Sequence, residues 1–183
     1  MKTALRNSLT VLGVFCLALV ALAAIKPSLD KEKSKIQFVG SKPSASHKGG
    51  FKVFDVDGNI DWGDLTKSSL KIEIDATSLW SDDGGLTNHL KNRDFLNVEK
   101  FPTIQFDATK IELGGAGIAT VSGKLTILGQ SVDATIPCKI ATTDSELTVT
   151  AKFAIDRTKW GMSYGQGRAN NDVDVLATLV FSR

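Results

Sequence analysis

Residues 119–140 read ATVSGKLTILGQSVDATIPCKI, and this stretch decides the fold class. Apolar or small side chains occupy every second position on both sides of a central turn, which is the period of half-buried β-strands. The turn, Leu128-Gly129-Gln130-Ser131, contains the glycine that a tight connection favours. Strands joined by so short a turn pair antiparallel, so this stretch predicts a β-hairpin.

The same alternation extends over most of the chain. Together with the hairpin it predicts about eight antiparallel strands, enough to close a barrel without exposed edges. A β-sandwich is the alternative all-β architecture. The further segments that we count as strands are residues 36–38, 51–60, 70–74, 104–108, 147–155 and 173–181.

One segment interrupts the strands. Between Ser78 and Phe101 the alternation stops, and Leu86 and Leu90 stand four residues apart after Gly84-Gly85. That spacing places both leucines on one face of a helix. We therefore predict a short helical insertion of one to two turns over residues 86–92, laid over one end of the barrel.

The N-terminus carries the pattern of an export signal. Lys2 and Arg6 precede an uncharged apolar run over residues 9–24, which closes with Ala21-Leu22-Ala23. A basic start, an apolar core and an A-x-A-like end predict a cleaved signal peptide over residues 1–23, and hence a periplasmic or secreted protein. An uncleaved anchor is the alternative, although a membrane-spanning helix needs about 20 apolar residues.

Loss of the signal peptide changes the charge of the chain. The formal net charge is +2, and Lys2 and Arg6 account for it, so the exported chain is formally neutral. A neutral chain gives no electrostatic reason to expect a nucleic-acid partner. Cys138 is the single cysteine after residue 23, so no internal disulfide is expected even in an oxidising compartment.

Five consecutive strands carry a small residue in the middle of the inward-facing row. Small side chains at similar heights would leave unfilled volume inside a barrel that is just wide enough for one small ligand. Alternatively, small and large residues alternate only to fit the taper of a filled barrel. The five residues are Ala108, Gly123, Ala134, Ala151 and Ala177.

Catalytic and metal-binding motifs are absent from the sequence. There is no G-x-S-x-G motif, and the two histidines, His47 and His89, are not spaced as metal ligands. Cys138 lies on an inward row, where an inert buried thiol is expected. The sequence therefore predicts neither an enzyme nor a metal or cofactor site. An enzymatic alternative would have to use His47, His89 or Asp82.

Apolar residues gather in two segments outside the strands. Such clusters either complete the core or form the mouth of an apolar pocket, with His89 or Arg157 as its polar tip. One cluster comprises Trp160, Met162 and Tyr164, and the other comprises Trp80, Leu86, Leu90 and Phe95.

Three stretches resemble the signature of the YceI-like family, the polyisoprenoid-binding, lipocalin-like proteins. They are residues 89–106 (HLKNRDFLNVEKFPTIQF), 123–129 (GKLTILG) and 153–162 (FAIDRTKWGM). Gly50-Phe51, with Phe54 and Gly58, is similar to the early G-x-F strand of the family. The matches occur in the family's order and delimit one domain over residues 34–183.

This resemblance implies a lipocalin-like antiparallel β-barrel, exported to the periplasm or beyond. It also implies an apolar tunnel that holds a long-chain isoprenoid lipid or a quinone-like molecule, often in a homodimer. One departure concerns Leu86-Thr87-Asn88, which stands where many members carry an Arg-Asp pair. Any headgroup contact made by that pair is not expected in this chain.

We predict an exported, non-enzymatic protein that sequesters or transports such a lipid without a cofactor. A filled barrel that binds a partner protein is a further alternative, because Leu176 and Val180 face outward from the last strand and require a helix or a second subunit to cover them. The predicted ligand-binding residues are Phe38, Phe106, Ala108, Ala134, Ala151, Phe153, Ala177 and Phe181, with Trp160 and Met162 near the mouth and His89 as a polar contact.

Overall fold

The computed structural model describes residues 28–183, so the predicted signal peptide lies outside the described residues. The described chain contains eleven strands, one α-helix and three short 3-10 helices. The strands are β1 (Ser28–Leu29), β2 (Lys35–Lys42), β3 (Ala45–Phe51), β4 (Phe54–Asn59), β5 (Ser69–Asp75), β6 (Leu79–Ser81), β7 (Thr103–Leu113), β8 (Ile118–Ile127), β9 (Gln130–Thr142), β10 (Glu146–Asp156) and β11 (Asp172–Ser182). The helices are η1 (Leu65–Lys67), η2 (Ala76–Ser78), α1 (Gly84–Lys91) and η3 (Arg157–Trp160).

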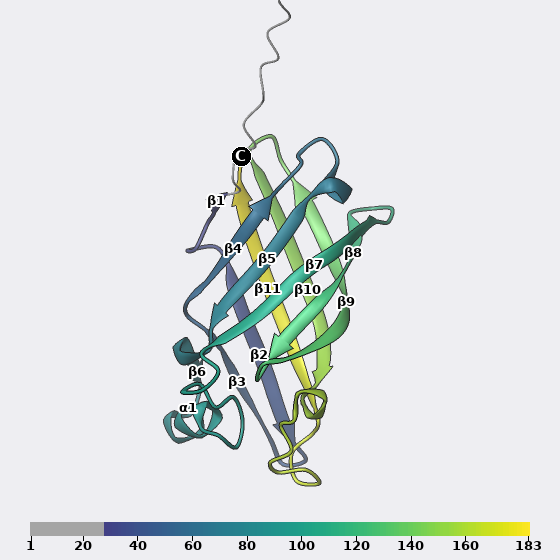
Figure 1. The fold of residues 1–183 in the computed structure, drawn as a ribbon. Helices are drawn as coiled ribbons and strands as arrows, with labels where there is room; N and C mark the ends of the chain where they lie inside the picture. The colour runs from purple at the N-terminus through teal and green to yellow at the C-terminus, as the bar shows by residue number, and fades with distance from the viewer. Residues whose placement is uncertain (1–27) are drawn as a thin grey trace, which may run out of the picture.

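All the strands belong to one curled antiparallel sheet (Figure 1). Its strand order is β4-β5-β7-β8-β9-β10-β11-β2-β3-β6, and β1 pairs with β11 beside this path. The predicted all-β antiparallel fold with a short helical insertion is confirmed. The hydrogen-bonded path ends at β4 and β6, so the sheet is a half-barrel rather than a ring of paired strands.

Ser78 ties the open side of the half-barrel at the corner between β3 and β4. Its hydroxyl oxygen accepts hydrogen bonds from the backbone N–H groups of Lys52, at 3.1 Å, and Val53, at 3.0 Å. The backbone N–H of Asp75 donates to the carbonyl of Val53 at 3.0 Å. Side-chain and loop contacts thus hold together two parts of the sheet that no strand ladder joins.

The structure contains three strands more than the sequence pattern predicts, namely β1, β3 and β6. Strand β3 reads ASHKGGF and has no apolar alternation, yet it pairs with β2 along its whole length. Its Gly49 is closely packed: a Cβ atom there would lie 2.6 Å from the Trp80 carbonyl oxygen and would collide with the Phe38 ring. The pairing depends on this close approach, which hydrophobic periodicity does not register.

The β8–β9 hairpin forms as predicted. Leu128 and Gly129 have φ angles of 53° and 71°, so both central residues of the two-residue turn lie in the left-handed region. A turn of this kind matches the right-handed twist of the paired strands. Pairing on the other side of β8 is less regular, since the register with β7 shifts between Ala108 and Lys110.

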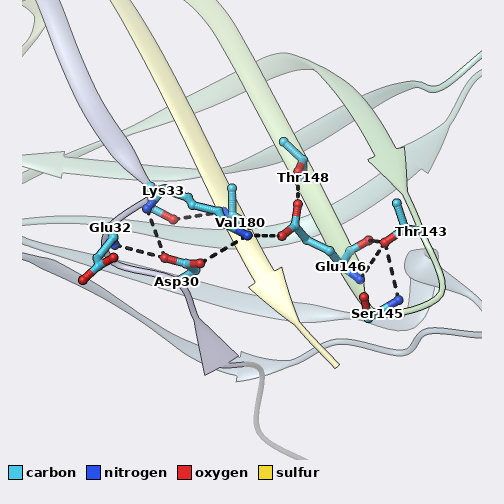
Figure 2. A network of polar contacts seen from close by, with 9 residues as sticks. Asp30, Glu32, Lys33, Thr143, Ser145, Glu146, Thr148 and Val180 are labelled. Atoms are coloured by element: carbon cyan, nitrogen blue, oxygen red, sulfur yellow. Dashed lines mark hydrogen bonds and ion pairs between the residues drawn. The ribbon is translucent and has the colours of Figure 1, made fainter.

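The chain preceding β2 packs against the C-terminal end of β11 (Figure 2). The backbone N–H of Asp30 donates to the carbonyl of Val180 at 2.8 Å, and the Ser34 hydroxyl accepts from the Val180 N–H at 3.0 Å. Lys33 Nζ reaches Glu146 Oε2 at 2.6 Å. Val180 is consequently buried by this chain's own segment, whereas Leu176, on the same outward row, is 42% exposed.

Two insertions lie at the same end of the sheet, opposite the C-terminus (Figure 1). One is α1, and the other is the connection between β10 and β11, residues 157–171, which begins with η3. We call this the helix end of the sheet. The helix prediction is confirmed, with α1 beginning at Gly84 because the Asp83 carboxylate caps it by accepting from the Leu86 N–H at 2.7 Å.

Candidate functional site

The curled sheet holds a cavity of about 420 Å³ on its concave side. This volume falls within the range of about 300–1,000 Å³ that is typical of small-molecule pockets. Strands from both halves of the sheet contribute inward-facing side chains to the lining, and α1 contributes Leu86 and Leu90. The i, i+4 pair of leucines that predicted the helix therefore faces the cavity.

Eight of the eleven residues that the sequence singles out for ligand binding line this cavity. They are Phe38, Phe106, Ala108, Ala151, Phe153, Met162, Ala177 and Phe181. Ala151 and Ala177 are cross-strand partners on β10 and β11, so two small side chains lie side by side in the wall. The space above them belongs to the cavity.

The other three residues lie elsewhere. Ala134 pairs with Gly123 on the inward row of β8 and β9, but neither residue lines the cavity. Trp160 is buried, and its Nε1 donates to the carbonyl of Leu125 at 3.0 Å, so it completes the core below β8. His89 points toward Asp94, with Nε2 and Oδ2 separated by 3.2 Å, and does not reach the cavity lining.

Three rings join the two insertions at the helix end. The His89 ring centroid lies 5.0 Å from that of Phe95 and 4.9 Å from that of Tyr164, and the Phe95 and Tyr164 centroids lie 5.4 Å apart. All three contacts have the edge-to-face geometry that aromatic pairs prefer. This aromatic clasp brings together the two apolar clusters that appear separately in the sequence.

Polar side chains of the lining gather at the same end. Asn170 donates from Nδ2 to the Ser41 hydroxyl at 2.8 Å, and its backbone N–H donates to the Ser41 carbonyl, also at 2.8 Å. Arg157, 4% exposed, lies next to them and donates from Nε to the Asn170 carbonyl at 3.1 Å. The cavity is therefore apolar along its length and polar at the helix end. The sequence does not indicate Ser41, in β2, or Asn170, in the connection between β10 and β11, because an isolated polar residue carries no periodic signal.

Besides Arg157, the titratable groups of the lining are Cys138, His47 and Lys42. Burial raises the pKa of the Cys138 thiol, which keeps it protonated and unreactive. His47 Nδ1 lies 2.9 Å from Asp82 Oδ1. The pKa of Asp82 is lowered chiefly by the Lys48 backbone N–H and then by His47.

Residues 28–183 contain neither a metal-binding cluster nor a membrane-spanning helix. No group of three or more His, Cys, Asp or Glu side chains in this part of the chain could hold a metal ion. None of its helices has the length and apolar character needed to cross a bilayer.

Comparison with known proteins gives a family match over nearly all of the described residues. The family model of the YceI-like domain matches residues 28–181. A UPF0312 protein of Serratia proteamaculans is 27% identical over 137 residues, which are 72% of this chain and 71% of that protein. A UPF0312 protein of Pseudomonas putida F1 is 37% identical over 83 residues, or 44% of this chain, and the match spans 42% of that protein's length.

Solved structures share the fold at low sequence identity. The crystal structure of Burkholderia cenocepacia BcnA superposes with a TM-score of 0.78 at 24% identity, covering 84% of this chain and 99% of that chain. A polyisoprenoid binding domain from Saccharophagus degradans superposes with a TM-score of 0.66 at 15% identity, covering 85% and 97%. At these identities the superpositions establish a shared architecture.

Proposed function

Because this chain belongs to the YceI-like domain family, we propose that it binds an isoprenoid-type lipid in the cavity of the half-barrel. The observation that carries the proposal is the apolar cavity of about 420 Å³. Its wall contains the paired Ala151 and Ala177 in place of larger side chains. The description of the Saccharophagus degradans neighbour as a polyisoprenoid binding domain supports the choice of lipid class.

Burial of the lipid chain supplies the affinity in this proposal. Each buried methylene contributes about 0.8 kcal/mol, so ten carbons contribute about 8 kcal/mol. Association costs on the order of 4–15 kcal/mol, which a longer chain exceeds. An apolar lining is sufficient for such binding, and no catalytic group or cofactor is needed.

The physiological role that we propose is sequestration or transport of the lipid outside the cytoplasm. It combines the cavity with the signal-peptide pattern of residues 1–23, which lies outside the described residues. A quinone-like ligand and a homodimer stay predictions from the family resemblance.

An enzyme that acts on a lipid in the same cavity is the alternative that one observation favours. His47 lines the cavity and is paired with Asp82, as a general base could be. Both side chains are partly exposed, at 40% and 43%, which is typical of a surface ion pair.

Native mass spectrometry of the exported protein, purified from its own host without detergent, tests the proposal. We expect a discrete added mass that organic extraction recovers as a long-chain isoprenoid. A bare protein mass, together with no uptake of added geranylgeraniol, would contradict lipid binding. Conversion of the added lipid into a new compound would favour the enzymatic alternative.

A further inference from the structure

Arg157 is a buried cation beside an apolar cavity. It stands at the first position of η3, directly after β10, and is 4% exposed. It is one of the residues that line the cavity at the helix end. Charged side chains are rarely buried to this degree unless an opposite charge or a full set of hydrogen bonds compensates for the lost solvation.

The guanidinium group is only partly satisfied by the protein. Nε donates to the Asn170 carbonyl, and Nη1 donates to the carbonyls of Met162 and Tyr164. Nη2 is buried and has no hydrogen-bond partner. A guanidinium group has five N–H donors, and the two on Nη2 are therefore left without an acceptor.

No carboxylate of residues 28–183 pairs with this charge. The three partners of Arg157 are neutral carbonyl groups, and the ion pairs of this region of the chain involve other cations. The carboxylate of Asp156 is close in sequence, but its Oδ1 accepts from the Thr158 N–H at 3.0 Å and from the Thr158 hydroxyl at 2.6 Å. Arg157 is only the last of the causes that lower the pKa of Asp156. Within the described chain, Arg157 therefore lacks an acceptor for Nη2 and has no carboxylate at ion-pair distance.

An elongated apolar surface leads away from this cation. The inward row of β10, from Ile155 through Phe153 and Ala151 to Val149, lines the cavity. These four residues cover roughly 20 Å at about 3.3 Å per residue. A molecule with its polar group at Arg157 would thus lay an apolar chain along β10.

We infer that the bound lipid carries an anionic oxygen headgroup, a phosphate or a carboxylate, which accepts hydrogen bonds from Nη2 of Arg157 at the helix end. The inference rests on the proposed lipid-binding function and deepens it. A planar guanidinium group binds such oxyanions through short, charge-assisted hydrogen bonds. The ligand would supply both the acceptor that Nη2 lacks and an anion in direct contact with the guanidinium group.

Lipids with one tail and different headgroups test the inference on the delipidated full-length protein. The isoprenoid probes are geranylgeraniol, geranylgeranyl phosphate and geranylgeranoic acid, with affinities measured by displacement of a fluorescent lipid. We expect the two anionic lipids to bind at least about tenfold more tightly than the alcohol. Equal affinity for the three would overturn the headgroup assignment while leaving lipid binding intact. Failure of all three to bind would contradict the proposed function itself.

The Arg157→Lys variant tests whether the Arg157 side chain causes the preference for anionic lipids over the alcohol. It keeps the charge but loses the planar pair of N–H donors, so we expect the preference for the anionic lipids to fall to about threefold or less. Geranylgeraniol binding by the variant reports whether the cavity is intact, and the preference is read as the ratio of the anionic-lipid affinity to this value. The matched control is Arg168→Ala, an exposed arginine of the same connection that does not line the cavity. An unchanged preference in Arg157→Lys would overturn the assignment.

Straight-chain probes distinguish an isoprenoid lipid from a fatty acid as the molecule that carries the anionic headgroup. Palmitate and hexadecanol repeat the comparison without isoprene units. A preference for palmitate over hexadecanol supports the Arg157 inference, since it depends on the headgroup alone. If palmitate also matches geranylgeranoic acid in affinity, the isoprenoid part of the proposed function is contradicted and the headgroup site stands.

Discussion

Two pairs of small residues occupy equivalent positions in the sheet and have opposite surroundings. Gly123 and Ala134 face each other across β8 and β9, and Ala151 and Ala177 face each other across β10 and β11. Only the second pair lines the cavity. In the sequence the four residues carry the same signal, a small side chain in the middle of an inward row.

The ring of Phe106 accounts for the different surroundings of the two pairs. It leans over Gly123, so that a Cβ atom on this glycine would lie 2.7 Å from Phe106 Cζ and 2.9 Å from Cε2. An aromatic ring thus fills the space above Gly123 in the first pair, whereas the space above Ala151 and Ala177 stays open. A small residue indicates room for a neighbour, and the neighbour is either a side chain or a ligand.

Substitution of Ala151 by Trp should remove the difference between the two pairs, and we expect it to have the largest effect on lipid retention. The indole would occupy the space above the Ala151–Ala177 pair, and we expect lipid retention to fall by more than about tenfold, because displacing two methylenes already costs about 1.6 kcal/mol. The amount of lipid that co-purifies with the folded variant measures this loss. Leu176→Trp, on the exposed outer face of β11, is the matched control and should retain lipid. Equal retention by both variants would show that the open space is not the binding site.

Gly123→Ala probes the filled pair. The new methyl group would meet the Asp107 carbonyl and the Phe106 ring, so we expect the free energy of unfolding to fall by about 1–3 kcal/mol. Lipid retention per folded molecule should not change. Gly115→Ala is the matched control, since a Cβ atom there meets nothing within 4 Å.

The role of Phe106 can be isolated in a double-mutant cycle monitored by denaturant unfolding. In a Phe106→Leu background the added methyl at Gly123 should cost less, because the smaller side chain leaves part of the space over the glycine empty. Additive losses would mean that the ring and the glycine do not share this space.

The smallest effect that we expect is that of acid, which should lower amide-exchange protection at η3 and leave the β8–β9 hairpin protected. The pKa of Asp156 lies below its usual value, chiefly because its carboxylate accepts from the Thr158 hydroxyl and then from the Thr158 N–H. The resulting stabilisation of η3 is present above the unfolded-state pKa of about 3.9 and is lost as pH falls through the lower folded-state pKa. Amide-exchange protection of Gly161, whose N–H donates to the Thr158 carbonyl, should therefore decrease at pH 3.

The control for the acid effect is Asp156→Asn, which still offers an oxygen acceptor to Thr158 but does not titrate. Its protection at Gly161 should not change between pH 6 and pH 3 after correction for intrinsic exchange rates. The β8–β9 hairpin, which has no carboxylate cap, should keep its protection in both proteins. Equal loss in the hairpin would indicate global acid unfolding in place of a local effect at η3.

Much of the fold was predictable because its signals are local. Alternation marks every long strand of the sheet, and the positive φ angles of Leu128 and Gly129 fit the two-residue turn expected there. Strand β3 escaped prediction because its pairing depends on two glycines that let β2 and Trp80 approach closely. That requirement comes from neighbours distant in sequence.

The candidate site was predictable in part. Alternation places Ala151, Phe153 and Ala177 on the inward row, and all three line the cavity. It places Ala134 there equally, but Gly123, the cross-strand partner of Ala134, lies under the Phe106 ring. The sequence indicates Arg157 only as one of two candidate polar tips, because its burial and its unpartnered Nη2 follow from how residues 162–170 fold around it.

By itself the sequence determined the all-β class, the hairpin and the short helix, since each depends on side chains within a few positions of one another. Only the tertiary structure decided that the sheet stays a half-barrel, that His89, Phe95 and Tyr164 join its two insertions, and that the cavity opens over Ala151 but not over Gly123. The physical reason is packing. Period-two alternation sets the face on which a side chain lies, whereas the orientation of one large ring, selected by all its neighbours together, sets which of two equal spaces remains empty.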